Sequence, residues 1–201
     1  MKMNILDIKK MAHEILKNQQ VENDFIEYKK SLTFKGSILK TACAFANNYM
    51  NNEIGLIFIG VEEVDDEKSG IKAIPKIPIS GIEKSLLEKT EKEVKSLLSH
   101  INVRPKINYQ IIADKIDNKH YIVIAIEEYY NGPYTTTEKA EKDENIRLKQ
   151  GKYIRIERDS RIPTSSEEYE LTRKFANLNF SSSWNEKATL DDLNWDYMKN
   201  I

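Results

Sequence analysis

Apolar residues recur along this chain at two different spacings, which predict both helices and strands. Over residues 4–17 they lie three and four positions apart, as one face of an amphipathic helix requires, and Asn4 is suited to cap the N-terminus of that helix. In the last part of the chain, Ser165 and Glu168 form the pattern of a capping box. The helical spacing predicts three further helices, over residues 37–50, 82–100 and 165–177.

The strongest strand signal is the run Ile54–Val61, whose sequence IGLIFIGV is almost wholly apolar. Such a run is typical of a strand that is buried on both faces and is therefore central in its sheet. A shorter run, residues 25–29, reads FIEYK and also favours a strand. Alternation places Glu27 and Lys29 on one face of this strand. By itself the pair needs no function, because it is compatible with an ion pair on a solvent-facing edge strand.

Other segments of the sequence predict a hairpin and two loops. Residues 106–116 and 120–127 alternate in part, as antiparallel strands with one covered face should. Asp117 and Asn118 between them are suited to a hairpin turn. Two polar and charged segments, residues 64–70 and 138–144, are expected to be loops.

Residues 152–158, KYIRIER, alternate again and predict a strand whose outward side carries Tyr153 and Arg155. They lie within residues 147–161, where six basic residues stand against two acidic ones. A tyrosine interleaved with arginines suits phosphate contacts and base stacking. The alternative is an outer strand whose arginines form salt bridges.

Composition narrows the class of protein. The 201 residues carry 31 Lys and Arg against 32 Asp and Glu, a formal net charge of -1, whereas a protein that coats nucleic acid usually has a basic excess. A local basic face remains compatible with this balance. The longest apolar run is too short to cross a bilayer, the N-terminus has no secretory pattern, and the single Cys43 excludes an internal disulfide. We therefore expect a soluble, cytoplasmic protein with no membrane partner.

Acidic residues gather at two places that bear on function. Glu22 and Glu27 lie five positions apart around the first strand, and Glu62 and Glu63 directly follow the buried apolar run. The carboxyl end of a central strand is where sheet proteins tend to place their chemistry. The alternative is a solvated acidic loop.

Residues 36–41, GSILKT, combine a glycine, a lysine and a threonine near the start of a helix. A phosphate-binding P-loop also needs a glycine directly before the lysine, so that the backbone can wrap around the phosphates. Leu39 occupies that position here. We therefore do not expect nucleotide binding at this loop.

Taken in order, several segments of the chain resemble the Schlafen AlbA-2 family, which is also described as a divergent AAA-4 or DNA-binding domain. The matching segments are Glu22 with Glu27-Tyr28-Lys29, Ala44–Asn47 (AFAN), Ile57–Glu63 (IFIGVEE), Pro133-Tyr134 and Tyr153–Ile156 (YIRI). The resemblance covers roughly residues 10–178 and implies an α+β fold, a mixed β-sheet with helices packed on it. The chain departs from the family pattern at the Asn-rich residues 48–53 and at Glu157, where the family has glycines.

The resemblance also predicts the organisation of the chain. We expect a Schlafen AlbA-2-like domain over residues 1–178, followed by a linker and the start of a truncated region over residues 179–201. Residues 179–188 are rich in Asn and Ser, and residues 189–201 begin a new amphipathic pattern that stops abruptly. In relatives such domains often precede an ATPase-like or winged-helix segment, so a C-terminal domain is expected to be missing from this chain.

In the Schlafen branch of the family, three acids form a metal-dependent ribonuclease site. By position the resemblance places them at Glu22, Glu27 and Glu62, with Glu63 as a neighbouring metal ligand. Clustered carboxylates suit Mg²⁺ or Mn²⁺, which would polarise a phosphate and activate a water molecule. Lys29 would neutralise phosphate charge.

Three functions therefore stay open. The first is a nucleic-acid-binding module of a transcriptional regulator or helicase-related protein, which binds DNA or structured RNA through Lys29, Tyr153, Arg155 and Arg158. The second is a divalent-metal-dependent nuclease that uses the acids, and the third is a protein-interaction module. Binding ranks first because it requires less than catalysis. The oligomeric state is left open, with a homodimer among the alternatives.

Overall fold

The computed structural model describes residues 4–52, 54–66, 70–127 and 131–182 of the chain. The helices are α1 (Ile5–Lys17), α2 (Lys35–Asn47), α3 (Leu87–Leu97), α4 (Glu138–Lys142) and α5 (Ser165–Ser182), with a 3-10 turn at Lys84–Leu86. The strands are β1 (Ile26–Lys29), β2 (Ile54–Ile59), β3 (Glu63–Asp66), β4 (Ile71–Pro75), β5 (Val103–Arg104), β6 (Tyr109–Ile116), β7 (Lys119–Glu127), β8 (Thr135–Thr136), β9 (Gly151–Lys152), β10 (Ile154–Ile156) and β11 (Asp159–Arg161).

The main sheet has the strand order β1-β2-β7-β6. β1 runs parallel to β2, whereas β2 with β7 and β7 with β6 are antiparallel, so the sheet is mixed and the predicted α+β fold is confirmed. β2 lies between two other strands, and Ile57 and Ile59 within it are at most 1% exposed. The prediction that residues 54–61 form a central strand with both faces covered is therefore confirmed.

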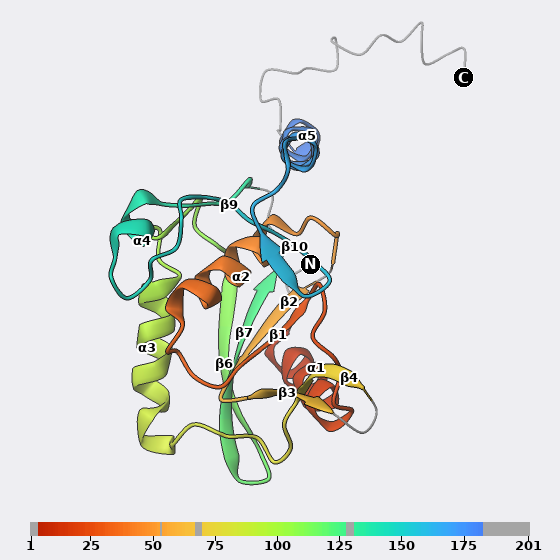
Figure 1. The fold of residues 1–201 in the computed structure, drawn as a ribbon, viewed down its shortest axis with the longest axis vertical. Coiled ribbons are helices and arrows are strands. Elements are labelled where there is room, and N and C mark those ends of the chain that lie inside the picture. Colours follow the sequence, from red (N-terminus) through yellow and green to blue (C-terminus); the bar gives the residue numbers. More distant parts are fainter. Residues whose placement is uncertain (1–3, 53, 67–69, 128–130, 183–201) are drawn as a thin grey trace, which may run out of the picture.

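Helices cover both faces of this sheet (Figure 1). Leu56 and Phe58 of β2 belong to a core cluster with residues of α1, and Ile57 and Ile59 belong to a second cluster with residues of α2 and α3. The two clusters lie on opposite faces because successive side chains of a strand point to opposite sides. α5 projects from the body of the domain (Figure 1).

Local signals account for several element boundaries. Asn4 caps α1 as predicted, since its side chain accepts a hydrogen bond from the Leu6 backbone N–H at 3.1 Å. Asp117 and Asn118 both have positive φ angles, 47° and 61°, and join β6 to β7 in the predicted hairpin. The residue pair at this turn suits two consecutive left-handed positions, because Asn and Asp tolerate them better than other side chains do.

Two segments predicted as loops contain regular structure. Glu63–Asp66 is β3, which pairs with β4 in a small hairpin beside the main sheet. Glu138–Lys142 is α4, a short helix capped by Thr137 and anchored by the buried Ala140. The charged side chains of both segments are compatible with regular structure. Backbone pairing with β4 holds β3 in place, and the buried Ala140 holds α4.

The C-terminal helix α5 begins one residue earlier than the capping box predicted from the sequence. Thr164 is the capping residue: its hydroxyl accepts from the Glu167 N–H at 3.4 Å, and the Glu167 carboxylate accepts from the Thr164 N–H at 2.8 Å. The helix continues through Ser182, so residues 179–182 of the predicted linker are helical. The remainder of that segment and the amphipathic pattern at 189–201 lie outside the described residues.

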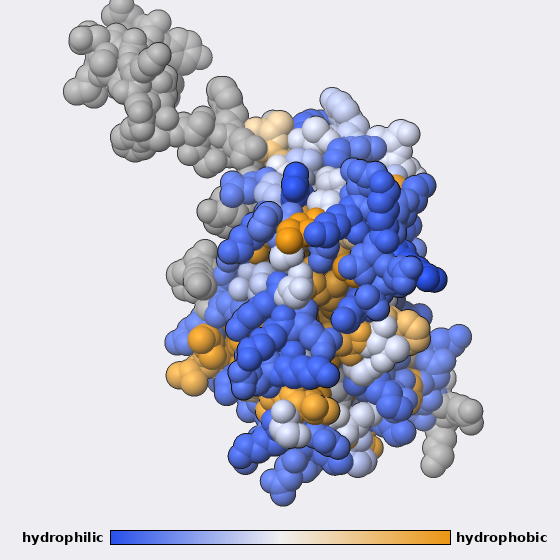
Figure 2. Space-filling view, turned by 90° about the vertical axis from the view of Figure 1, so that its left-hand side faces the viewer, coloured by the Kyte–Doolittle hydropathy of each residue, from blue (hydrophilic) through white to orange (hydrophobic). Residues whose placement is uncertain are grey.

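No helix in the described ranges combines the length and apolarity that crossing a bilayer requires. Figure 2 shows that the side of the molecule carrying α3 and α4 is mainly hydrophilic. Hydrophobic side chains on this face form separate small patches between charged ones.

Candidate functional site

The free edge of β1 is the structural centre of the candidate site. β1 is an edge strand of the main sheet, and its backbone pairs with β2 through alternate residues, as the hydrogen bond from Leu56 N–H to the Phe25 carbonyl shows. The backbone groups of Ile26 and Tyr28 therefore point away from β2. Unpaired groups on a buried strand edge are costly unless other atoms satisfy them.

Charged side chains satisfy this edge in place of another strand. The Tyr28 N–H donates to Glu22 Oε1 at 2.6 Å, and the Tyr28 carbonyl accepts from Lys29 Nζ at 3.1 Å. The Ile26 carbonyl accepts from Arg155 Nη2 at 3.1 Å. Together with Asn23, whose Oδ1 accepts from the Ile26 N–H at 2.9 Å and whose N–H donates to the Ile26 carbonyl at 3.3 Å, Glu22, Lys29 and Arg155 close the sheet edge. The sequence did not predict this structural role.

Glu27 lies at the centre of the same network, which we call the edge network (Glu22, Glu27, Lys29 and Arg155). Its Oε1 atom is 2.5 Å from Lys29 Nζ, and its Oε2 atom is 2.6 Å from Arg155 Nη1. β1 is an edge strand and Glu27 pairs with Lys29, as the structural interpretation of this segment predicted. The Glu27 side chain is almost fully buried, so only the prediction that the pair faces solvent is wrong. Both carboxylate oxygens are engaged by cations.

The predicted outward orientation of Tyr153 and Arg155 is also wrong. Arg155 is 3% exposed, and its guanidinium carbon lies 5.4 Å from the centre of the Phe45 ring of α2. The arginine also donates from Nε to the Asn23 carbonyl at 2.6 Å. Tyr153 is 4% exposed, and its hydroxyl donates to the Lys149 carbonyl at 2.8 Å. Both faces of β10 are covered, so alternation along this strand does not separate inside from outside.

The carboxyl of Glu22 has a strongly raised pKa, about 8. Burial is the largest cause, and the nearby Glu27 and Glu63 carboxylates raise the pKa further, while the hydrogen bond from the Tyr28 N–H and the charge of Lys29 oppose them. The raised pKa favours the protonated form of Glu22 near neutral pH. Its backbone N–H donates to the Ala73 carbonyl of β4 at 2.9 Å, which fixes the residue between β1 and the β3–β4 hairpin.

The acid that approaches Glu22 from the end of β2 is Glu63 rather than Glu62. Glu62 is held elsewhere: its carboxylate lies 3.0 Å from Lys30 Nζ and 3.4 Å from Lys76 Nζ, and these lysines lower its pKa. Glu63 opens β3, and its charge contributes to the raised pKa of Glu22. The resemblance had given Glu63 as the neighbour of the third acid.

The acids do not fit a metal ion as they lie. Among the described residues, no three His, Cys, Asp or Glu side chains are placed to hold one. Both oxygens of Glu27 are engaged by Lys29 and Arg155, so binding a metal ion there would require these cations to move. The raised pKa of Glu22 is the effect expected of neighbouring carboxylates with no ion between them. The catalytic and metal-binding roles of Glu22, Glu27, Glu62 and Glu63 stay predictions.

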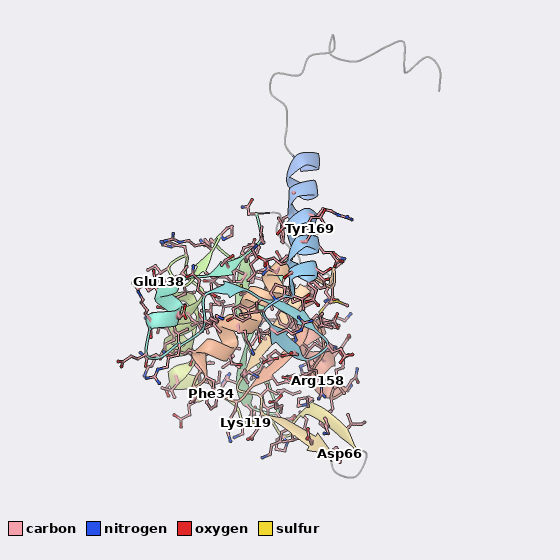
Figure 3. The ribbon with its side chains drawn as sticks, turned by 45° about the horizontal axis from the view of Figure 1, so that its top comes forward. Phe34, Asp66, Lys119, Glu138, Arg158 and Tyr169 are labelled. Atoms are coloured by element: carbon pink, nitrogen blue, oxygen red, sulfur yellow. The ribbon has the colours of Figure 1, made fainter. Side chains whose placement is uncertain are left out.

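About half of the basic stripe over residues 147–161 is neutralised. Lys152 lies 2.7 Å from Glu168, and Arg161 forms a two-pronged interaction with Glu167 at 2.6 and 2.7 Å. Arg158 remains exposed at the turn between β10 and β11 (Figure 3). It lines an open groove of about 670 Å³ whose charged side chains are mostly acidic.

A second groove, of about 810 Å³, lies beside the N-terminus of α2, and we call it the basic groove. Neither Lys40 nor Arg147 has a carboxylate at ion-pairing distance within the described part of the chain. Lys35 is paired with Glu93 at 3.3 Å, on the partly exposed side of α2. The charged residues that line the groove are Lys29, Lys30, Lys35, Lys40 and Arg147, together with Glu62, Glu63 and Glu144.

Close packing holds the two walls of the basic groove together. A Cβ atom on Gly36 would lie 2.2 Å from the Ile146 carbonyl oxygen, so only glycine allows the first turn of α2 to approach residues 144–148 this closely. α2 begins at Phe34 without a side-chain cap, and its first turn carries no acidic residue. The positive end of the helix dipole is therefore not offset by an acid on this turn.

The sequence did not predict this groove, although a local signal for it is present. Residues 34–40, FKGSILK, place an aromatic residue and two lysines at a helix start, and the pattern was tested only as a P-loop. Arg147 was counted with the basic stripe. Its position opposite α2 depends on tertiary packing, since more than 100 positions separate it from Lys40.

Comparisons with known proteins bear on this geometry. A family model described as Schlafen, AlbA_2 matches residues 22–164. The N-terminal domain of an ATP-dependent DNA helicase RecG-related protein from Nitrosomonas europaea has a similar structure, with 15% identity, 63% of this chain and 74% of that chain covered, and a TM-score of 0.41. The DIP2311 protein from Corynebacterium diphtheriae shows 11% identity over 83% of this chain and 28% of its own, with a TM-score of 0.43.

The chain thus spans less than a third of the DIP2311 protein. At these identities and TM-scores neither structure carries an argument about function. No curated protein matches the chain.

Proposed function

This chain belongs to the Schlafen AlbA_2 family, and on that premise we propose that it is a nucleic-acid-binding module whose phosphate contacts are made in the basic groove. The observation that carries the proposal is the pair Lys40 and Arg147, two cations that have no ion pair with any described residue and line one hollow. An unpaired cation gains most from a phosphate, because no existing ion pair has to be broken and bound counterions are released. The formal net charge of -1 limits such a surface to one local region, as the sequence analysis required.

The groove suits a polyanion better than a single small anion. Five basic residues line it against three acidic ones, and Lys30 and Lys35 hold their carboxylate partners on partly exposed surfaces where such pairs are weak. Repeated phosphates could therefore compete with Glu62 and Glu93 for these lysines. Of the edge network, Lys29 also lines the groove.

Replacing both Lys40 and Arg147 with alanine is expected to weaken binding of DNA and RNA and to flatten its salt dependence. Each lost phosphate contact reduces the slope of log Kobs against log salt by about 0.9 for a duplex and about 0.7 for a single strand, so the double variant should lose roughly twice that. Fluorescence anisotropy at several salt concentrations measures both quantities. The domain should unfold at the wild-type temperature, because neither side chain forms an ion pair within the described ranges.

The matched control replaces Lys72 and Arg158 with alanine, two exposed cations that line the acidic groove. This variant should bind as the wild type does, which would also separate the basic groove from the Arg158 surface predicted from the sequence. Equal losses in the two double variants would show diffuse charge attraction and contradict the groove. A wild-type domain that binds neither DNA nor RNA would overturn the proposed function.

A metal-dependent nuclease is the second candidate, favoured by the approach of Glu63 to Glu22 beside Glu27. Because the described acids do not form a metal-binding group, we expect added Mn²⁺ to leave the unfolding temperature unchanged and labelled RNA and DNA intact. A ligand that binds only the folded state would raise that temperature. A rise that is lost in Glu27→Gln, together with cleavage, would establish the nuclease and show that the edge network rearranges.

A further inference from the structure

Phe34 is the most exposed of the large hydrophobic residues in the described part of the chain, with 73% of its surface accessible. It belongs to neither core cluster. Its position at the start of α2 calls for a capping side chain such as Ser, Thr, Asp or Asn, and phenylalanine supplies no cap. A fully buried ring of this kind contributes about 1.5–3 kcal/mol to stability, but the exposed Phe34 ring gains little of this. Folding alone therefore gives no reason for a phenylalanine here.

The ring lines the basic groove, next to the cations already described. The aromatic Tyr28 also lines the groove, but that side chain is fully buried, so it offers no free face to a ligand. Phe34 is therefore the exposed aromatic ring of this groove. A cationic groove with an accessible aromatic face is the arrangement that binds single-stranded nucleic acid, because the cations follow the backbone and the ring stacks on a base.

The chemistry of the ring distinguishes between nucleic acids. Phenylalanine has no hydrogen-bond donor or acceptor, so in the grooves of a duplex it can only contact a thymine methyl group. Its gain comes from stacking on a base face, which is accessible only where the base is unpaired. A hydrophobic wedge inserted between the base pairs of a duplex is the competing arrangement, and it would need the duplex to be kinked.

We propose that the basic groove binds single-stranded or unpaired nucleotides, with the Phe34 ring stacked on one base while Lys40 and Arg147 contact the neighbouring phosphates. This inference rests on the proposed function and specifies its ligand. Sequence preference is expected to be weak, because every base has a face on which an aromatic ring can stack.

The test compares Phe34→Ala with the wild type on a labelled oligo(dT) or oligo(U) single strand and on a blunt duplex of equal length. Stacking contributes about 1–3 kcal/mol per base, so the variant should lose roughly 5- to 150-fold in affinity for the single strand. Affinity for the duplex should stay within about twofold. The salt slope should not change, since no phosphate contact is removed.

Two further variants make the comparison specific. Phe34→Trp should restore single-strand affinity, because indole stacks at least as well as a phenyl ring. Tyr169→Ala removes a similarly exposed aromatic ring, 67% accessible, on α5 and outside the groove, and should have no effect (Figure 3). Both Phe34 and Tyr169 are exposed, so neither replacement should disturb folding.

Each outcome has a distinct meaning. Equal losses on single strand and duplex, or no loss in Phe34→Ala, would overturn the stacking role of Phe34, while the proposed function would still stand if Lys40→Ala with Arg147→Ala flattens the salt slope. A loss confined to the duplex would show a wedge and also overturn this inference. If the wild type binds neither nucleic acid, the proposed function and the inference fail together.

Discussion

Replacing Arg155 with alanine is expected to destabilise the domain by roughly 3–5 kcal/mol, the usual cost of removing one partner of a buried ion pair. The change would leave the Glu27 carboxylate buried with only Lys29 as a counter-charge. It would also remove the Nε donor to the Asn23 carbonyl and one of two donors to the Ile26 carbonyl on the free edge of β1, which keeps the Asn23 N–H at 3.3 Å. Most of the cost therefore comes from groups left without partners, rather than from the net gain of the pair itself.

Urea unfolding followed by circular dichroism measures this effect. Arg158→Ala is the matched control, because Arg158 lies in the same hairpin but is exposed, and it should change stability by less than about 0.5 kcal/mol. Arg155→Lys should recover only part of the loss, since an ammonium group cannot reproduce the planar fork of a guanidinium. A loss below about 1 kcal/mol in Arg155→Ala would contradict the edge network. Below its unfolding temperature the Arg155→Ala variant should bind nucleic acid with the wild-type dependence of affinity on salt. Replacing an arginine that contacts phosphate would instead flatten that dependence.

The second large effect is a pH dependence that Glu22 imposes on stability. Its folded pKa of about 8 lies above the ordinary value of 4.5, so between these values the folded state keeps a proton that the unfolded chain has released. The proton stabilises the folded state fully below pH 4.5, and that contribution is lost as pH rises towards 8. The free energy of unfolding should therefore fall with a slope of at most about 1.4 kcal/mol per pH unit.

Glu22→Gln isolates this contribution. Glutamine stays neutral and keeps an oxygen that can accept from the Tyr28 N–H, so the variant should match the wild type near pH 5. At pH 8 it should be more stable by on the order of 3 kcal/mol. The measurement is a series of urea unfolding curves from pH 5 to pH 8. Glu83→Gln, an exposed glutamate without an ion pair among the described residues, should show the wild-type slope. Parallel curves for the wild type and Glu22→Gln would refute the buried, protonated carboxyl.

The main sheet and its helices were predictable because their signals are local. Both alternating sets of residues in Ile54–Val61 are apolar, so a strand formed by this run has two apolar faces that must be buried. In the structure every residue of β2 is buried. Asn4 caps its helix and the Asp117-Asn118 turn joins its two strands through interactions with residues that are close in sequence, and both predictions are confirmed. The family match follows from the same kind of local motif, read in order along the chain.

The sequence by itself thus determined the α+β architecture, the central strand, the family and the residue types near the first strand. The tertiary structure alone decided which of those residues are accessible. Alternation shows that Tyr153 and Arg155 share a face, but whether that face meets solvent depends on α2 and on the edge of β1, which are more than 100 positions away. Tertiary packing also places the Arg155 side chain against the free edge of β1. It likewise brings Lys40 and Arg147, which no local motif connects, into the lining of one groove. Periodicity records contacts within an element, whereas burial and charge pairing are set by distant elements that pack against it.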